Sequence, residues 1–300
     1  MLQAIADPIL PIFAVLAAGF LLCRLSVFDS GHATAINRFV FYLAAPALVF
    51  VIFARAPLGN LNLPILASYF AAEILIYCTV TWLARFVFRL AFAESLLLGM
   101  TAIFSNHVFF VLPIATLVYG PSVALPIGGV IIVDVVSFCV TVFLVDATTS
   151  KVGGSRKALA GLARNPFVYA PILGAAAWWA GDYVPSGVMT FSDFAGAAAA
   201  PVSLFALGVI LAGLPLRPIG WLVVFVVCAK LLLHPSLVTF GNSIFGDNSD
   251  WGGIAVLVAA GPCGAMPFVI AIQYGVEVER ISKAVLISTV LSVITLSILI

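Results

Sequence analysis

The chain has 300 residues, of which 64% are hydrophobic and only 8% are charged, and its formal net charge is +1. A soluble domain is usually about 25% charged and about 45–50% apolar, so this composition excludes a soluble globular protein. The small net charge and the lack of a basic tract give no indication of a nucleic-acid partner. Apolar runs near ~20 residues recur throughout, each long enough to cross ~30 Å of hydrocarbon. We therefore expect an all-α integral membrane protein.

Polar or turn-rich gaps divide the chain into ten predicted transmembrane helices. The expected spans are 8–24, 37–54, 63–88, 95–119, 123–146, 166–183, 195–213, 219–241, 252–275 and 280–300. No basic segment precedes the first apolar run, so we expect 8–24 to be a membrane span and not a cleaved signal peptide.

The lysines and arginines predict the orientation. With the N-terminus outside, eleven of the 13 basic residues fall in the inner gaps or at inner helix ends, Arg55 falls outside, and Lys230 lies within a span. This bias follows the positive-inside rule, so both termini are expected on the non-cytoplasmic side. The expected location is the plasma membrane, the inner membrane in a bacterium.

Two halves of the sequence resemble each other at an offset of 155 residues. Identical residues at that offset include Pro11 and Pro166, Gly19 and Gly174, Pro46 and Pro201, and Phe50 and Phe205. Five spans per half is an odd number, so the second half enters the membrane with opposite polarity, as in many secondary transporters. We predict one five-helix repeat in 1–147, a basic cytoplasmic linker in 148–165, and the inverted repeat in 166–300.

Spans four and nine carry helix breakers next to polar groups. Span four has the sequence "FSNHVFFVLPIATLVYG" and contains Pro113, whereas "AGPCGAMPFVIAIQYG" in span nine contains Gly264 and Pro267. A proline cannot donate the helical backbone hydrogen bond, and unsatisfied polar groups survive in a membrane only where protein, water or ligand covers them. Broken helices at matched positions of the repeat therefore predict a crossing that lines a central cavity. Simple kinks in continuous helices are the alternative.

Several stretches of the chain resemble the auxin efflux carrier family, which includes bacterial malonate and other organic-acid permeases. These stretches are "NRFVFYLAAPALVF" (37–50), "SNHVFFVLPIATLVYG" (105–120), "NPFVYAPILG" (165–174), "AAPVSLFALG" (199–208) and "MPFVIAIQYGVEVERISKAVLISTVLS" (266–292). The resemblance covers residues 8–300. It implies ten helices in two inverted repeats, a crossing centred on Pro113 and Pro267, and transport of organic anions. The family typically has glycines where this chain has Val108 and Val111, so the pocket is expected to differ in shape.

Candidate substrate-binding residues lie around the two breaks. They are Asn106, His107, Pro113, Gly264 and Pro267. Asn106 offers both donors and an acceptor, which makes it the best single candidate for a substrate contact. His107 could instead cap a helix end.

Four ionisable residues fall well inside predicted spans: Glu73, Asp134, Lys230 and His234. A charge near the bilayer centre costs at least ~2.5–3.5 kcal/mol, so each should face a partner or water. Lys230 and His234 are four apart and share a helical face. We expect these residues to act in ion coupling or gating, with a purely structural salt bridge as the alternative.

The leading prediction is a secondary transporter that moves small organic anions by alternating access across the lipid bilayer. No nucleotide-binding or catalytic motif indicates an enzyme, no cysteine–histidine spacing indicates a metal site, and no cofactor is expected beyond coupling to H⁺ or Na⁺. The alternatives are a Na⁺-coupled symporter of the bile-acid type and a membrane sensor without transport. A homodimer is compatible with the sequence.

Overall fold

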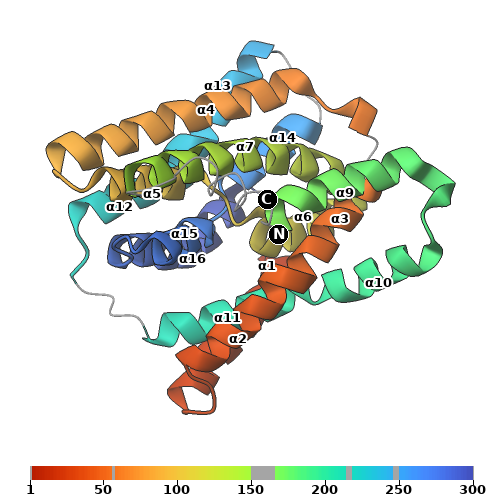
Figure 1. Ribbon diagram of the computed structural model, residues 1–300, viewed down its shortest axis with the longest axis horizontal. Coiled ribbons are helices and arrows are strands. Elements are labelled where there is room, and N and C mark those ends of the chain that lie inside the picture. Colours follow the sequence, from red (N-terminus) through yellow and green to blue (C-terminus); the bar gives the residue numbers. More distant parts are fainter. Residues whose placement is uncertain (1, 56–57, 150–165, 214–217, 246–249, 300) are drawn as a thin grey trace. The chain divides into compact units, whose positions relative to one another are not determined.

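The computed structural model describes residues 2–55, 58–149, 166–213, 218–245 and 250–299. Within these ranges the chain is helical, with no strand and one isolated bridge between Ser105 and Cys263 (Figure 1). The predicted linker 148–165 lies outside the described residues from position 150 onward.

Helical segments overlap the regions expected from the sequence, but the helix predicted as 195–213 starts earlier, at Ser186. In the first half they are α1 (Leu2–Arg24), α2 (Ser30–Phe39), η1 (Val40–Ala44), α3 (Ala45–Arg55), η2 (Leu58–Asn60), α4 (Leu63–Trp82), η3 (Leu83–Val87), α5 (Phe92–Ile103), η4 (His107–Val111), α6 (Leu112–Tyr119), η5 (Pro121–Val123) and α7 (Ala124–Thr149). In the second half they are α9 (Pro166–Ala180), η6 (Gly181–Tyr183), α10 (Ser186–Ala197), α11 (Ala199–Gly213), α12 (Trp221–Cys228), η7 (Ala229–Leu233), α13 (His234–Phe245), α14 (Asp250–Ala259), α15 (Met266–Tyr274) and α16 (Glu279–Leu299).

In the described part of the chain, six helical stretches are long and apolar enough to cross a membrane. They are Ser30–Arg55, Leu63–Val87, Pro121–Thr149, Ser186–Gly213, Trp221–Phe245 and Glu279–Leu299. The multi-pass membrane class predicted from composition is thereby supported. The stretch predicted as 37–54 starts earlier, at Ser30, because Asp29 caps the helix by accepting a hydrogen bond from the His32 backbone N–H at 2.9 Å. Apolar windows cannot detect this polar first turn.

The chain forms two compact units, and both halves of the sequence contribute to each. The first unit comprises Met1–Leu61, Val108–Gly128 and Arg164–Pro215, and the second comprises Asn62–His107, Gly129–Ala163 and Leu216–Ile300. Each unit is therefore assembled from segments that are far apart in the sequence.

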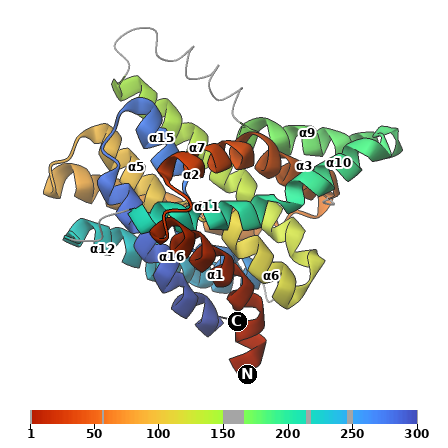
Figure 2. The same ribbon diagram turned by 90° about the horizontal axis from the view of Figure 1, so that it is seen from below.

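In the first unit, α1 packs on α11 and α3 packs on α9, as Figure 2 shows. The contacts are close at two glycines. A Cβ on Gly19 would overlap the backbone carbonyl oxygen of Phe205, and a Cβ on Gly174 would lie 2.6 Å from the carbonyl oxygen of Phe50. Only glycine therefore permits these helix approaches.

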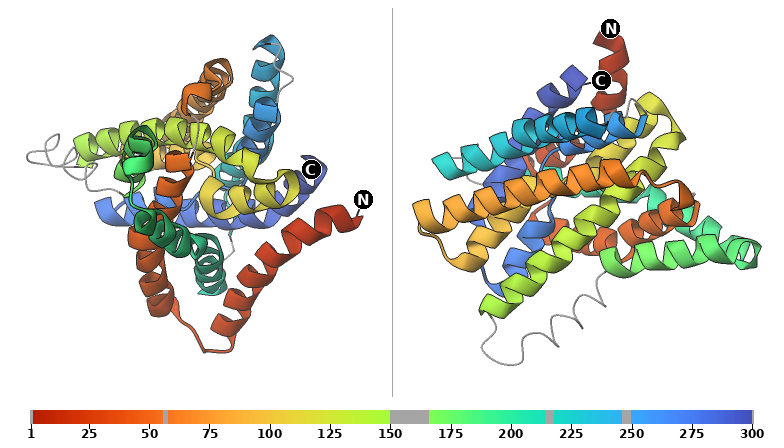
Figure 3. Two further views of the ribbon diagram at one scale, coloured as in Figure 1. Left: turned by 90° about the vertical axis from the view of Figure 1, so that its right-hand side faces the viewer. Right: turned by 90° about the horizontal axis from the view of Figure 1, so that it is seen from above.

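In the second unit, α4 packs against α5 and α13, α13 packs against α14, and α12 packs against α16 (Figure 3). Two wide helical turns in this unit, η3 and η7, interrupt α-helical geometry. Such π-type turns are frequent at functional sites, and η7 carries Lys230.

Candidate functional site

Two unwound segments of the second unit cross each other. The first follows the end of α5 at Ile103 and the second follows the end of α14 at Ala259. They pair through two backbone hydrogen bonds, from Asn106 N–H to the Pro262 carbonyl at 2.9 Å and from Gly264 N–H to the Phe104 carbonyl at 2.8 Å. The crossing thus satisfies backbone groups that a helix would otherwise have paired.

The close approach at the crossing depends on Gly264. A Cβ at this position would lie 2.6 Å from Cδ1 of Phe104 and 3.0 Å from the carbonyl oxygen of Ser105. Both distances are shorter than ordinary van der Waals contact, so a side chain would force the two segments apart.

The crossing lies N-terminal to the prolines on which the family resemblance centred it. Pro113 is the second residue of α6 and Pro267 is the second residue of α15. Proline is favoured in the first turn of a helix because no intrahelical partner is lost there. Pro267 therefore begins the helix after the second break, whereas Pro113 follows the wide turn η4 within the helical stretch His107–Tyr119. The paired residues themselves are Ser105 and Cys263.

Side chains satisfy the carbonyl groups where α14 ends. The Ser105 hydroxyl donates to the Val258 carbonyl at 2.8 Å, and Lys230 Nζ donates to the Ala259 carbonyl at 2.5 Å. A cation at this end of a helix is favourable because the helix dipole is negative there. Lys230 therefore binds the carbonyl of the last residue of α14, directly before the second unwound segment.

A buried acidic pair lies in the same unit, on α4 and α7. Glu73 and Asp134 have exposed fractions of 0% and 1%. The Ser137 hydroxyl donates to Glu73 Oε2 at 2.7 Å, and His107 Nε2 lies 2.8 Å from Asp134 Oδ2. The predicted ionisable residues Glu73 and Asp134 are thus brought together, and the crossing residue His107 joins them.

Lys230 and His234 also belong to this cluster. Lys230 Nζ lies 3.3 Å from His234 Nδ1, both side chains are fully buried, and the His234 ring lies 4.9 Å from the Tyr69 ring between centroids. Among the ion pairs of the described residues, none joins Lys230 to Glu73 or Asp134. Lys230 therefore contacts His234 and the Ala259 carbonyl, and the ion-coupling or gating role expected of these residues stays a prediction.

The remaining predicted residue, Asn106, is half-buried at the crossing. Its backbone N–H is used in the pairing, and no hydrogen bond joins its side-chain amide to any part of the chain that the structure describes. Val108 and Val111, which replace the glycines typical of the family, are buried, with exposed fractions of 1% and 0%.

Sequence reasoning missed Ser105 and Ser137 as members of the site. Both serines lie in apolar sequence, where a serine hydroxyl usually donates a hydrogen bond to the backbone carbonyl one helical turn earlier. A signal was nevertheless present for each, because Ser105 adjoins Asn106 and Ser137 follows Asp134 by three residues, on the same helical face.

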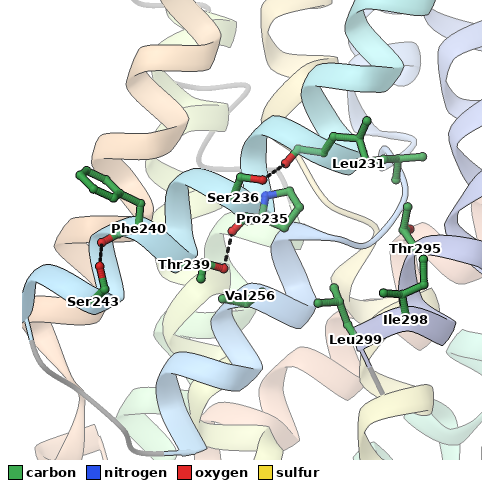
Figure 4. Close-up of a pocket in the computed structure, with 11 residues that line it drawn as sticks. Leu231, Pro235, Ser236, Thr239, Phe240, Ser243, Val256, Thr295, Ile298 and Leu299 are labelled. Carbon is green, nitrogen blue, oxygen red and sulfur yellow. Dashed lines mark hydrogen bonds between the residues drawn. The ribbon is translucent and has the colours of Figure 1, made fainter.

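A separate groove of about 490 Å³ lies on α13, α14 and α16 (Figure 4). Its lining is mainly apolar, with Leu232, Phe240 and Ile298 among its exposed side chains. The hydroxyls of Ser236 and Thr239 donate to carbonyls of their own helix, to Leu232 at 2.7 Å and to Pro235 at 2.8 Å. The groove therefore offers hydrocarbon surface and no convergent donors for a small anion.

The described residues contain no group of three or more histidine, cysteine, aspartate or glutamate side chains that could hold a metal ion. The acidic pair supplies two carboxyl groups, which are fewer oxygen ligands than Ca²⁺ or Mg²⁺ usually takes from a site.

Comparison with known proteins gives consistent results over the whole chain. A family model described as "Membrane transport protein" matches residues 4–300. The chain is 32% identical over 301 residues to the "Putative malonate transporter" of Rhizobium meliloti (strain 1021), covering 96% of this chain and 92% of that protein. It is 22% identical over 303 residues to the "Uncharacterized transporter YfdV" of Escherichia coli (strain K12), covering 98% and 96%.

The match extends through both unwound segments and the buried cluster, so it includes every residue of the candidate site. These relatives are named as transporters, which agrees with the prediction that the protein is not an enzyme. The chain belongs to the membrane transport protein family of auxin efflux carriers, as the resemblance of its sequence motifs indicated.

Proposed function

We propose that the protein is a secondary transporter of small organic anions, mono- or dicarboxylates such as malonate, and that it works by alternating access. The crossing of two unwound segments carries this proposal. Irregular backbone inside an apolar helical unit is tolerated where it lines a cavity, and transporters place substrate sites at such breaks. The second break is followed by α15, whose first N–H groups and positive dipole end suit an anion.

Asn106 is the residue that we assign to substrate recognition at the crossing. It is half-buried and its amide has no partner within the described chain, so it is available to a ligand. An amide NH₂ group can donate two hydrogen bonds to a carboxylate. His107 contacts Asp134 and is better suited to linking substrate and cluster than to holding the anion alone.

The proposed architecture is ten transmembrane helices in two inverted five-helix repeats, 1–147 and 166–300. The close contacts at Gly19 and Gly174 support it, because each obeys the 155-residue offset: Gly19 approaches Phe205 as Gly174 approaches Phe50. The short helices support it as well. With 12 residues in α5 and 10 in α14, neither crosses the ~30 Å hydrocarbon core without the helix after its break.

The distribution of lysine and arginine supports non-cytoplasmic termini, a cytoplasmic linker at 148–165 and a location in the plasma membrane, the inner membrane of a bacterium. Malonate enters the proposal through the printed name of the Rhizobium relative. Coupling to Na⁺, as in bile-acid symporters, and a non-transporting sensor are the competing functions. A homodimer is compatible with the proposal and is not required by it.

Uptake of labelled malonate into proteoliposomes under an imposed pH gradient tests the function. We expect uptake above that of protein-free vesicles, and at least tenfold less uptake by Asn106→Asp, which keeps the shape of the side chain and repels an anion. Gly253→Ala is the matched control, because a Cβ at Gly253 in α14 meets no atom within 4 Å.

The competing functions give different results in the same assay. Malonate uptake that requires a Na⁺ gradient would favour the symporter of the bile-acid type. Malonate binding by the purified protein without uptake under either gradient would favour the sensor. Neither binding nor uptake would exclude malonate as the substrate.

A further inference from the structure

The connection between α4 and α5 carries arginines and aromatic side chains together. Residues 82–92 have the sequence "WLARFVFRLAF" and include the C-terminal end of Leu63–Val87, which is long and apolar enough to cross a membrane. Both arginines, Arg85 and Arg89, are exposed. The exposed aromatic side chains of the same segment are Trp82, Phe86, Phe88 and Phe92. We name residues 82–92 the basic aromatic turn.

The backbone of the basic aromatic turn brings the head group of Arg85 close to Arg89. Arg85 Nη1 donates to the Leu90 carbonyl at 2.9 Å, and Leu90 directly follows Arg89. The Leu90 N–H donates in turn to the Ala84 carbonyl at 3.1 Å, which closes the end of the helix. The Arg85 guanidinium therefore lies beside the piece of backbone from which the Arg89 side chain leaves.

Arg89 has a backbone conformation that usually belongs to glycine. Its φ is +56°, and it directly follows Phe88, which caps the C-terminal end of η3. Glycine is the usual residue at this position because a Cβ makes the left-handed conformation costly. Strained backbone of this kind is found at functional sites, so the Arg89 side chain is a candidate for a specific role.

The two arginines have no anionic partner within the described chain. None of the ion pairs of the described residues includes Arg85 or Arg89. The nearest carboxylate in the sequence, Glu94, is instead paired with Arg280 at 2.5 Å. The positive charge of the turn is therefore open to an anion from outside the chain. A guanidinium group suits phosphate in particular, because its planar N–H donors match the phosphate oxygens.

We propose that the basic aromatic turn binds an anionic membrane phospholipid. Arg85 and Arg89 hold its phosphate group, and the exposed rings lie against its glycerol and acyl region. The rings favour a lipid over free phosphate, because tryptophan is enriched at membrane surfaces and Trp82 packs on Phe86 with ring centroids 6.0 Å apart. The end of a membrane-crossing helix lies at the depth of the lipid head groups. This lipid site does not depend on the proposed transport function.

Native mass spectrometry of the purified full chain, with phosphatidylglycerol or phosphatidylcholine added to the detergent, tests the site. We expect tighter binding of phosphatidylglycerol, and we expect Arg85→Gln and Arg89→Gln each to weaken it about fivefold, or about 1 kcal/mol. Arg89→Gln keeps the fold testable, because no hydrogen bond joins the Arg89 side chain to the described residues. Its unfolding temperature without added lipid should match that of the native protein.

The matched control is the double variant Arg24→Gln with Arg38→Gln. It removes two positive charges from exposed positions of α1 and α2, outside the basic aromatic turn, and should leave the affinity for phosphatidylglycerol unchanged. An equal loss of affinity in this control would show that the lipid responds to net charge alone, which would overturn the site. Equal binding of the two lipids by the native protein would overturn it as well.

Tryptophan fluorescence then locates the bound lipid. The chain has five tryptophans, so the signal of Trp82 is obtained as the difference between the native protein and Trp82→Phe. We expect phosphatidylglycerol with brominated acyl chains to quench this signal at lower concentration than brominated phosphatidylcholine, and we expect Arg89→Gln to remove that difference. Equal quenching by both lipids would overturn the proposal. Displacement of the lipid by an equal concentration of inorganic phosphate would indicate a simple phosphate site and would overturn it too.

Discussion

Gly264→Ala should separate the two unwound segments. The new Cβ would lie 2.6 Å from Phe104 Cδ1 and 3.0 Å from the Ser105 carbonyl oxygen, so the backbone must move as well as the ring. Overpacking of this kind costs about 1–3 kcal/mol, and each backbone hydrogen bond weakened at the crossing adds about 0.5–1.5 kcal/mol. With two such bonds at 2.8–2.9 Å, we expect a loss of about 2–6 kcal/mol.

Thermal unfolding of the purified protein in detergent measures this loss, with Gly253→Ala as the control. The control lies in α14, has no neighbour within 4 Å of its new Cβ, and should be neutral or stabilising because alanine favours a helix by up to ~1 kcal/mol. The Phe104→Leu background should recover part of the loss, since the phenyl ring is one of the two obstructing groups. If Gly264→Ala unfolds at the same temperature as Gly253→Ala, the crossing is not as closely packed as the reasoning requires.

Three further predictions concern other contacts. Gly19→Ala and Gly174→Ala should each destabilise the protein by about 1–3 kcal/mol in the same unfolding assay, and a neutral result at both would contradict the close helix approaches. The exposed side chains of Arg55 and Asp193 form two hydrogen bonds, of 2.9 Å and 2.5 Å. A double-mutant cycle on Arg55→Ala and Asp193→Ala should give a coupling free energy of about 0.2–1 kcal/mol that falls with added salt. An unchanged coupling free energy in high salt would show that the pair is not screened. Ser137→Ala should destabilise the protein by about 1–3 kcal/mol in the unfolding assay, because the hydroxyl donates to the buried Glu73 Oε2 at 2.7 Å. An unchanged unfolding temperature would contradict this contact.

The membrane class and the positions of the helices could be predicted because hydrophobicity acts over whole segments. The break in span four could be anticipated from Asn106, His107 and Pro113. Polar side chains and the backbone groups that a proline leaves unpaired are costly to bury in a membrane unless they have hydrogen-bond partners. The location of the crossing could not be predicted as well. Proline stabilises the start of a helix as readily as it ends one. Here Pro267 is the second residue of α15, and Pro113 lies inside the helical stretch His107–Tyr119, directly after the wide turn η4.

The composition of the buried cluster was only partly predictable. Glu73, Asp134, Lys230 and His234 are conspicuous because charge is rare in membrane helices. Their partners are not conspicuous in the sequence, since the carbonyl of Ala259 is available only because α14 ends there. A bond that depends on where a distant helix terminates cannot be derived from the spacing of side chains.

Alternating access is the central claim, and counterflow in proteoliposomes tests it most directly. Vesicles preloaded with unlabelled malonate are placed in labelled malonate at equal pH and without a salt gradient. Alternating access predicts transient accumulation of label above its outside concentration, because a carrier that returns loaded exchanges one anion for another. Entry of label at the same rate and to the same level in vesicles without internal malonate would contradict the account.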